Sequence, residues 1–344
     1  MKAVVKIQEG KGNVKVTEAE KPVPEQGQVL IRVKAAGICG TDLHILNDNS
    51  YPIKPPVTLG HEVSGVIEEL GQGVEGWKVG DAVVSETYYY TCGNCFFCKT
   101  GNINLCEKKL SIGSGVNGAM ADFVRVPAKN LHHMPKGFTF EEACMTEPLV
   151  CCVQAVFQHA SLQPGDKVVL TGPGTIGLLT LQAIKLFGCD VIVLGTKKDE
   201  ERLKMAKRLG ADQIMYVEEP DLQERVKAYC RGVGADSAFD CSGAGAAINL
   251  CMDLMRKGGH FTQVGIPGKP VAIDMGKVVL REYTIAGTYA TRPVWWDKTI
   301  ELLNAGKIQL KPLMSETYSL CDWEKGFTNA LNGVGFKHIL VPEK

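Results

Sequence analysis

The pattern of apolar and polar positions changes character near residue 150. Before it, short runs of β-branched residues are separated by Gly, Pro or Asn and helical periodicity is weak, so we expect strands and turns. From about 150 to 290, apolar strands alternate with segments of helical spacing, which predicts a parallel, doubly wound sheet covered by helices. The predicted strands are 4–7, 28–34, 63–70, 82–84, 167–171, 191–194, 238–240 and 260–264, and 199–209 is a predicted helix.

Mixed character returns after residue 290, with a helix expected around 297–304 and short strands after it. We expect this tail to pack back on the first half of the chain. The predicted fold class is therefore α/β, with a β-rich domain of residues 1–150 and 291–344 and a doubly wound domain of residues 151–290.

The composition of the chain excludes several classes of protein. Its 344 residues are 45% hydrophobic and 22% charged, which is too apolar for a disordered chain. Lys+Arg and Asp+Glu both total 38, and this neutral balance argues against a nucleic-acid partner. No apolar run approaches the ~18 residues that span a bilayer, and the first residues lack the pattern of a signal peptide. We therefore expect a cytoplasmic protein without a membrane partner.

A glycine-rich turn, Gly172-Pro-Gly-Thr-Ile-Gly177, follows the predicted strand 167–171 and opens a helix. In this context G-x-G-x-x-G indicates dinucleotide binding, because the three glycines allow a tight turn, a close pyrophosphate and close helix packing. The phosphates are expected at the helix N-terminus. A turn without a ligand is the alternative. The predicted cofactor contacts are Gly172, Gly174, Thr175, Ile176 and Gly177, with Val264 and Gly265 after a later strand.

The end of the next strand bears on the choice of dinucleotide. NAD-binding proteins usually place Asp or Glu here to hold the ribose 2′-OH. This chain has Gly195, Thr196, Lys197 and Lys198 instead. A carboxylate would repel a 2′-phosphate, whereas a hydroxyl and two cations would accept one, so we predict a preference for NADP(H) over NAD(H). The alternative is that both lysines only solvate a surface loop.

Four of the thirteen cysteines are clustered between residues 92 and 106. The spacing Cys92-x2-Cys95-x2-Cys98-x7-Cys106 places four thiolates on one loop, which can close tetrahedrally around a structural zinc ion. An iron–sulfur cluster is the main alternative, but in the ferredoxin pattern the fourth cysteine follows after three residues and precedes proline. The gap of seven residues favours zinc.

A second set of candidate metal ligands is dispersed along the chain. The segment Gly37-Ile-Cys-Gly-Thr-Asp-Leu-His44 contains Cys39, and Gly60-His-Glu62 follows it. Cys39, His61 and a carboxylate would make a mixed sulfur, nitrogen and oxygen site. Sites with three protein ligands and one open position are the catalytic kind.

Together these motifs resemble the zinc-dependent medium-chain alcohol dehydrogenase family. The resemblance rests on Gly-His-Glu-x2-Gly-x5-Gly-x2-Val at 60–74, the four-cysteine lobe at 92–106 and the glycine turn at 172–177. It implies a GroES-like catalytic domain, completed by the C-terminal tail, around a Rossmann dinucleotide-binding domain. It also implies two zinc ions per chain, one catalytic and one structural, and a homodimer or homotetramer.

In this resemblance Cys39 and His61 are ligands of the catalytic zinc, and Glu62 is a ligand or exchanges with one. Glu147 takes the place of a further cysteine ligand, as in the polyol (sorbitol-type) branch of the family. Whether Glu147 binds zinc directly or through water stays open. An acidic residue at a helix N-terminus is its alternative role.

The resemblance also implies the chemistry. Zinc lowers the pKa of an alcohol, and the alkoxide gives up hydride to a nicotinamide. Thr41 and His44 match the hydroxyl and the histidine that carry the released proton to water in the family. A histidine on a surface loop is the alternative interpretation of His44.

The substrate is harder to read from the sequence. Glu147 favours a polyol or sugar alcohol, but Gly287-Thr-Tyr-Ala-Thr-Arg292 departs from sorbitol dehydrogenases, where an Arg-Tyr pair helps to bind the polyol. Ala290 or Thr291 falls near that arginine, and Arg292 is displaced. This stretch and the Cys-Gly-Thr-Asp-x-His opening also resemble threonine dehydrogenases. The alternatives are therefore a threonine or simple secondary-alcohol dehydrogenase and a non-catalytic dinucleotide-binding protein. A zinc-ribbon nucleic-acid module conflicts with the neutral charge.

Overall fold

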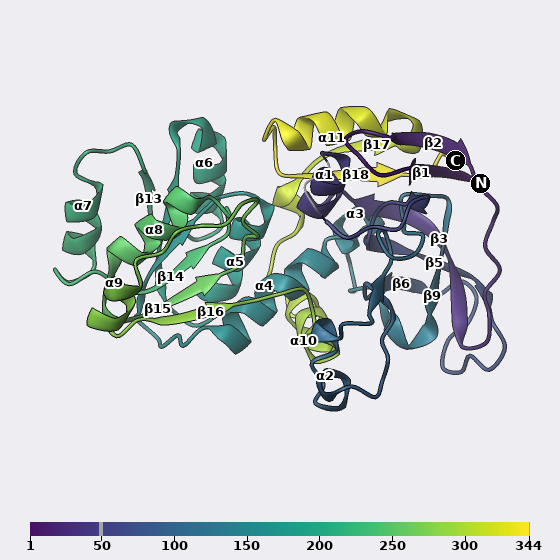
Figure 1. The fold of residues 1–344 in the computed structure, drawn as a ribbon, viewed down its shortest axis with the longest axis horizontal. Coiled ribbons are helices and arrows are strands. Elements are labelled where there is room, and N and C mark those ends of the chain that lie inside the picture. Colours follow the sequence, from purple (N-terminus) through teal and green to yellow (C-terminus); the bar gives the residue numbers. More distant parts are fainter. Residues whose placement is uncertain (48–50, 344) are drawn as a thin grey trace. The chain divides into compact units, whose positions relative to one another are not determined.

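The computed structural model describes residues 1–47 and 51–343, which form two compact units (Figure 1). Unit 1 contains Met1–Pro148, Thr291–Gly306 and the segment that begins at Leu313. Unit 2 contains Leu149–Ala290 and Lys307–Pro312. Each unit has its own sheet and its own buried apolar core. Within the described ranges, no helix combines the length and the apolar character that a membrane span requires.

Unit 1 is built on a seven-stranded sheet in the order β10-β6-β5-β3-β18-β17, with β9 also paired to β3. Its strands are β3 (Gln28–Gly37), β5 (Glu62–Leu70), β6 (Ala82–Ser85), β9 (Phe123–Pro127), β10 (Leu131–His133), β17 (Met314–Ser319) and β18 (Lys337–Val341). Val33 is buried between exposed Arg32 and Lys34, which is the period of two that a half-buried strand requires. β18 pairs antiparallel with β3, so the tail packs on the first half of the chain as predicted.

Two smaller sheets and several helices complete unit 1. The sheets join β1 (Lys2–Lys6), β2 (Val14–Glu18) and β4 (Val57–Thr58), and β7 (Tyr88–Tyr90) with β8 (Leu110–Ser111). The helices are α1 (Gly40–Leu46), α2 (Phe96–Lys99), α3 (Phe140–Ala143), α10 (Pro293–Asn304) and α11 (Trp323–Leu331). Strands and turns alone were therefore the wrong expectation for residues 1–150. Helices of 4 to 7 residues are too short to show a 3.6-residue period.

Unit 2 contains a fully parallel six-stranded sheet in the order β13-β12-β11-β14-β15-β16, which confirms the doubly wound fold. Its strands are β11 (Lys167–Thr171), β12 (Asp190–Gly195), β13 (Gln213–Tyr216), β14 (Ala235–Asp240), β15 (Met255–Gln263) and β16 (Thr284–Gly287). Its helices are α4 (Thr146–His159) from Leu149 onward, α5 (Thr175–Lys185), α6 (Glu200–Arg208), α7 (Leu222–Tyr229), α8 (Gly245–Leu254) and α9 (Met275–Leu280). The strand order reverses between β11 and β14. Ligands of such sheets bind at the carboxyl ends of the strands beside this point.

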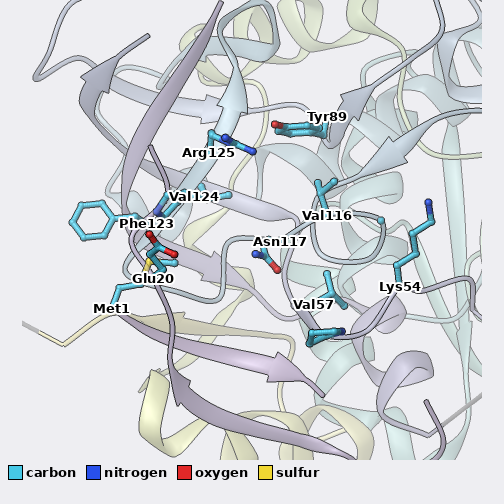
Figure 2. Close-up of a pocket in the computed structure, with 14 residues that line it drawn as sticks. Met1, Glu20, Lys54, Val57, Tyr89, Val116, Asn117, Phe123, Val124 and Arg125 are labelled. Carbon is cyan, nitrogen blue, oxygen red and sulfur yellow. The ribbon is translucent and has the colours of Figure 1, made fainter. Parts of the chain in front are cut away.

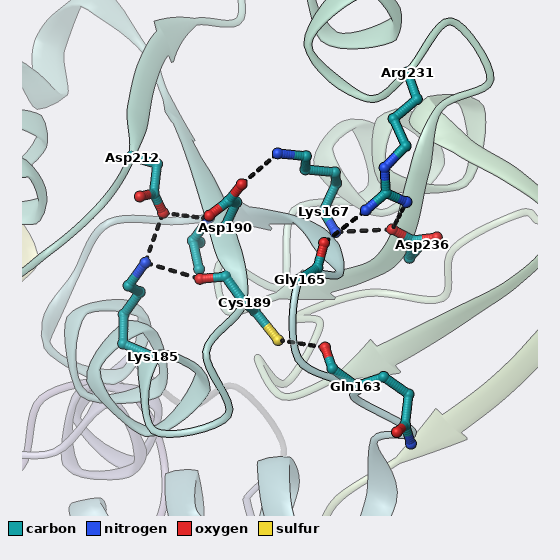
Figure 3. A network of polar contacts seen from close by, with 10 residues as sticks. Gln163, Gly165, Lys167, Lys185, Cys189, Asp190, Asp212, Arg231 and Asp236 are labelled. Atoms are coloured by element: carbon teal, nitrogen blue, oxygen red, sulfur yellow. Dashed lines mark hydrogen bonds and ion pairs between the residues drawn. The ribbon is translucent and has the colours of Figure 1, made fainter.

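Two aspartates fix the amino ends of the strands in unit 2 (Figure 3). Asp212 Oδ2 accepts hydrogen bonds from Lys185 Nζ and from the backbone N–H of Val191, both at 2.7 Å. Asp236 Oδ2 accepts the backbone N–H of Lys167 at 2.8 Å. These carboxylates connect neighbouring strands at their amino ends, whereas the glycine turn lies at the carboxyl ends.

The same aspartates should make the protein sensitive to acid. Burial raises the pKa of Asp212, but the Lys185 ammonium and the Val191 N–H outweigh it, so the pKa lies below its ordinary value. Arg256 lowers the pKa of Asp236 against the same effect of burial. A carboxylate of lowered pKa stabilises the fold above its unfolded pKa and loses that contribution as the pH falls through the folded pKa.

We therefore expect the free energy of unfolding to fall between about pH 5 and pH 2. Because Asp212→Asn removes one of these carboxylates, its stability should fall less steeply over the same range. Urea unfolding of both proteins, followed by circular dichroism at a series of pH values, measures the two slopes. Equal slopes would contradict the assignment.

Candidate metal and dinucleotide sites

The sheet register of unit 1 brings three candidate ligands together. β3 ends two residues before Cys39, and β5 begins directly after His61. Gly37 and Glu62 are partners in the ladder between these strands, and a Cβ on Gly37 would lie 2.0 Å from Glu62 Oε2, so glycine is required here. The ligand atoms of Cys39, His61 and Glu62 all lie within 4.8 Å of one another.

Glu62 is held by a cation from the far end of the chain. Both of its carboxylate oxygens accept hydrogen bonds from Lys337 Nζ on β18 at 2.7 Å, and Lys337 also donates to Ile38 O at 3.0 Å. Glu62 is fully buried and the Lys337 side chain is 6% exposed, so the ion pair lies out of water. No local pattern marks Lys337, and sequence reasoning missed it.

The surroundings of His61 are strongly negative. Burial lowers the pKa of His61, but the Cys39 thiolate and the Asp42 carboxylate more than compensate, so the pKa lies well above its ordinary value. Asp42 is itself fully buried, and its Oδ2 accepts the Cys39 backbone N–H at 2.9 Å. An anionic pocket that would hold a proton on an imidazole also suits a divalent cation. Cys, His and Glu are ligands that zinc takes, so these residues fit the metal.

Glu147 lies beside this group, in the first turn of α4. It is 7% exposed, and burial raises its pKa to about 7, with Glu62 adding to the shift and His61 opposing it. Among the described residues, the set whose ligand atoms lie within 4.8 Å of one another contains Cys39, His61 and Glu62 without Glu147. Direct zinc binding by Glu147 stays a prediction.

Thr41 and His44 both lie on α1, the short helix that begins next to Cys39. They are three residues apart and therefore lie on the same face of the helix, and both are half-buried. The position suits a path from the metal group toward water. Their part in a proton relay stays a prediction.

The four clustered cysteines meet in space. Their sulfurs lie within 4.8 Å of one another, with Cys92 Sγ 3.9 Å from Cys98 Sγ and 3.7 Å from Cys106 Sγ. Four sulfurs bound tetrahedrally at ~2.3 Å from zinc would be ~3.8 Å apart, so the lobe fits a structural zinc ion. Backbone N–H groups of Asn94 and Cys95 lower the pKa of Cys92 to about 6, which favours the thiolate that a metal needs.

The glycine turn has the geometry of a phosphate site. Gly172 has φ +83°, and a Cβ on Gly177 would lie 2.0 Å from Gly172 O, so both positions require glycine. At Gly174 the space is open. In the described part of the chain no side chain caps α5, which begins at Thr175, so its first N–H groups are free to bind an anion. The turn therefore fits a pyrophosphate.

Arg202 on α6 is a basic side chain that lies near this turn. Sequence reasoning missed it. A Cβ on Gly174 would lie 4.0 Å from Arg202 Nη1, and Arg202 also pairs with Asp199 at 3.7 Å. A guanidinium beside an open turn favours phosphate groups. Arg202 lies in a helix with many charged residues, and its position in the sequence does not distinguish it from the side chains that only face water.

The segment after β12 differs in detail from the sequence-based expectation. The Thr196 hydroxyl donates to Asp199 Oδ2 at 2.7 Å, so it is already used as a donor. Lys197 and Lys198 are exposed, and no ion pair within the described residues engages their ammonium groups. A Cβ on Gly195 would meet neighbouring side chains at 3.0–3.3 Å. Two exposed lysines thus follow directly after Thr196, and their role in the choice of dinucleotide stays a prediction. Val264 and Gly265 lie at the carboxyl end of β15, at the same edge of the sheet.

A surface pocket of about 340 Å³ lies elsewhere in unit 1 (Figure 2). Lys54, Asn117, Phe123 and Arg125 are among its lining residues, and none of the predicted site residues lines it. The pocket is thus separate from the metal group.

Known proteins match the chain over its whole length. Residues 25–136 match the alcohol dehydrogenase GroES-like domain, and residues 175–305 match the zinc-binding dehydrogenase family. The chain is 41% identical to a sorbitol dehydrogenase of Halalkalibacterium halodurans, with 99% of each chain covered. It is 38% identical to a D-arabitol-phosphate dehydrogenase of Enterococcus avium, with 99% of this chain and 97% of the relative covered.

One solved structure extends this similarity to three dimensions. It is assigned as a zinc-binding dehydrogenase from Sinorhizobium meliloti 1021 and has NADP bound. The TM-score is 0.91 at 29% identity, with 99% of both chains covered.

Proposed function

This chain belongs to the zinc-dependent medium-chain alcohol dehydrogenase family, and from this premise we propose that it oxidises the secondary alcohol of a polyol or sugar alcohol with NADP. Its relatives are dehydrogenases that act on CH–OH groups. The observation that carries the proposal is the convergence of Cys39, His61 and Glu62 in unit 1. The open glycine turn on an uncapped helix in unit 2 supports a nicotinamide cofactor.

We assign residues 1–150 and 291–344 to the GroES-like catalytic domain and residues 151–290 to the dinucleotide-binding domain. Each chain would hold two zinc ions. The proposed ligands are Cys39, His61, Glu62 and Glu147 for the catalytic ion, and Cys92, Cys95, Cys98 and Cys106 for the structural ion.

The mechanism follows from the placement of these groups. Zinc, when bound, would lower the pKa of the substrate's hydroxyl group, and this favours loss of hydride from the carbon that carries that hydroxyl. The products are a ketone, the reduced nicotinamide and one proton. Thr41 and His44 carry that proton from the alcohol oxygen toward water. The free N–H groups at the start of α5 hold the pyrophosphate and so position the nicotinamide.

The preference for NADP rests on charge. Lys197 and Lys198 are exposed cations in the segment that follows β12, where an acid would repel a 2′-phosphate. Substituting an acid at Gly195 is a poor test, because its Cβ would force Pro173 and Asp199 to shift. The lysines are the better positions to change.

L-Threonine is the second candidate substrate, because residues 39–44 carry the Cys-Gly-Thr-Asp-x-His opening. Arg292 donates to Asn102 Oδ1 at 2.8 Å in the four-cysteine lobe, which agrees with its displacement from the polyol-binding position. The substrate panel must therefore include both classes.

We also propose that the protein is a cytoplasmic homodimer or homotetramer. β16 is an edge strand with Ile285 40% exposed, and nearby Leu280 is 81% exposed. An exposed apolar sheet edge favours pairing with a second copy.

The test is reduced-nicotinamide absorbance on the zinc-loaded protein. Sorbitol, other polyols, L-threonine and simple secondary alcohols are each offered with NADP and with NAD. We expect turnover of a polyol with NADP, lost on chelation. In Lys197→Gln/Lys198→Gln the KM for NADP should rise about tenfold, equal to ~1.4 kcal/mol, while the KM for NAD stays within about twofold.

Two results would overturn parts of the proposal. A lower KM for NAD than for NADP in the unmodified protein contradicts the cofactor preference. Silence across the panel with tight cofactor binding contradicts the substrate class.

A further inference from the structure

A buried carboxylate, Asp240, lies at the carboxyl end of β14 in unit 2 and is fully buried. Its Oδ1 accepts hydrogen bonds from Thr171 Oγ1 at 2.8 Å, Ser242 Oγ at 2.6 Å and the Ser242 backbone N–H at 3.1 Å. Its Oδ2 accepts from the Gly243 backbone N–H at 2.8 Å and Gln263 Nε2 at 2.6 Å. Five donors from the ends of three strands, β11, β14 and β15, thus converge on one side chain.

The backbone of Asp240 extends this contact. Its carbonyl oxygen accepts the N–H groups of Val264 and Gly265, both at 2.9 Å. Gln263 Nε2, which donates to the carboxylate, also donates to Gly265 O at 2.6 Å. The loops that follow β14 and β15 are therefore fixed to each other through Asp240 and Gln263.

The loop after β14 packs closely against the glycine turn on one side and against the loop after β15 on the other. A Cβ on Gly172 would lie 2.6 Å from Ser242 N, and a Cβ on Gly265 would lie 2.5 Å from Gly243 N. The loop after β14 is therefore in close backbone contact with both the glycine turn and the loop after β15.

From this arrangement we propose that Asp240 and Gln263 are positioning residues for the nicotinamide half of the cofactor. In a sheet of this order, a dinucleotide lies across the point between β11 and β14, with one half over each set of strands. The glycine turn and the segment after β12 serve the adenosine half, and the loops after β14 and β15 serve the other. The inference rests on the proposed function, which supplies the nicotinamide cofactor.

A purely structural role makes a different prediction. A carboxylate that only holds strand ends together would affect stability, and it would affect both halves of the cofactor equally. A positioning role affects the nicotinamide half selectively. The two roles can therefore be separated by comparing the whole cofactor with a fragment that lacks nicotinamide.

The experiment compares Asp240→Asn and Gln263→Met with the unmodified protein. Fluorescence titration gives the Kd of NADPH, and calorimetry gives the Kd of 2′,5′-ADP. We expect the Kd of NADPH to rise about tenfold and kcat to fall about tenfold, while the Kd of 2′,5′-ADP stays within about twofold. The emission maximum of bound NADPH should shift toward that of free NADPH.

Asp212→Asn is the matched control, because it removes an aspartate that connects strands of the same sheet at their amino ends, away from the glycine turn. It should lower stability and leave both Kd values unchanged. Gln263→Met keeps the carboxylate and four of its donors, so it answers the question even where Asp240→Asn does not fold.

The outcomes separate the two claims. If the unmodified protein binds neither NADPH nor NADH, the proposed function fails. If it binds NADPH and the variants weaken the cofactor and the fragment equally, or weaken neither, the positioning role is wrong.

Discussion

Lys337→Met is expected to lower the free energy of unfolding by about 3–5 kcal/mol, because it strands a buried carboxylate. Both oxygens of Glu62 accept from Lys337 at 2.7 Å, and neither side chain is more than 6% exposed. All four tryptophans, Trp77, Trp295, Trp296 and Trp323, lie in unit 1 together with this pair. Tryptophan fluorescence in a urea titration therefore reports on the unit that contains the change.

Lys325→Met is the control for losing a lysine. Lys325 is 71% exposed and pairs with Asp322, so its removal should cost less than about 1 kcal/mol. Equal midpoints for the two variants would show that the Glu62–Lys337 pair contributes nothing particular to unit 1.

His61→Ala should reduce kcat/KM at least about a thousandfold, which corresponds to ~4 kcal/mol of transition-state stabilisation. Loss of a ligand from the group of Cys39, His61 and Glu62 would remove the proposed zinc ion, which would polarise the alcohol. Elemental analysis should find one zinc ion per chain in the variant and two in the unmodified protein, since the proposed site in the four-cysteine lobe is separate. Binding of NADPH should stay within about twofold, because the glycine turn belongs to unit 2.

His133→Ala is the matched control, since His133 is exposed on β10. It should keep both zinc ions and full turnover. If His61→Ala kept both as well, Cys39, His61 and Glu62 would not be the catalytic metal site.

The features that sequence analysis predicted correctly are those that depend on short, continuous segments of the chain. The strand 167–171 and the glycine turn that follows it were placed correctly, because an apolar run and a G-x-G-x-x-G pattern are local signals. The four cysteines carry their spacing within fifteen residues. β14 was predicted too short, since Asp236 and Ser237 are buried polar residues that interrupt the apolar run. β15 begins five residues before the predicted start, in a stretch with two basic residues and two glycines that carries no strand pattern.

The features that it missed depend on contacts between distant residues. Lys337 meets Glu62 across 275 positions, and only the pairing of β18 with β3 makes that contact. Asp240 ends a predicted strand, and Ser242 and Gly243 are local donors to it, but Thr171 and Gln263 reach it from β11 and β15, and no spacing in the sequence encodes that approach. The hydroxyl of Thr196 was expected to face the cofactor, whereas a local bond to Asp199 uses it.

The long separation of Glu62 and Lys337 has a consequence for the growing chain. At ~5–20 residues per second, a ribosome needs about 14–55 s to add the 275 residues between them. Most of unit 2 is one continuous segment and can form its sheet in that interval. Until β18 is synthesised, the edge of β3 that pairs with it stays unpaired, and Glu62 lacks Lys337. The last strand to be synthesised, β18, therefore completes a sheet whose first strand, β3, is made near the start of synthesis.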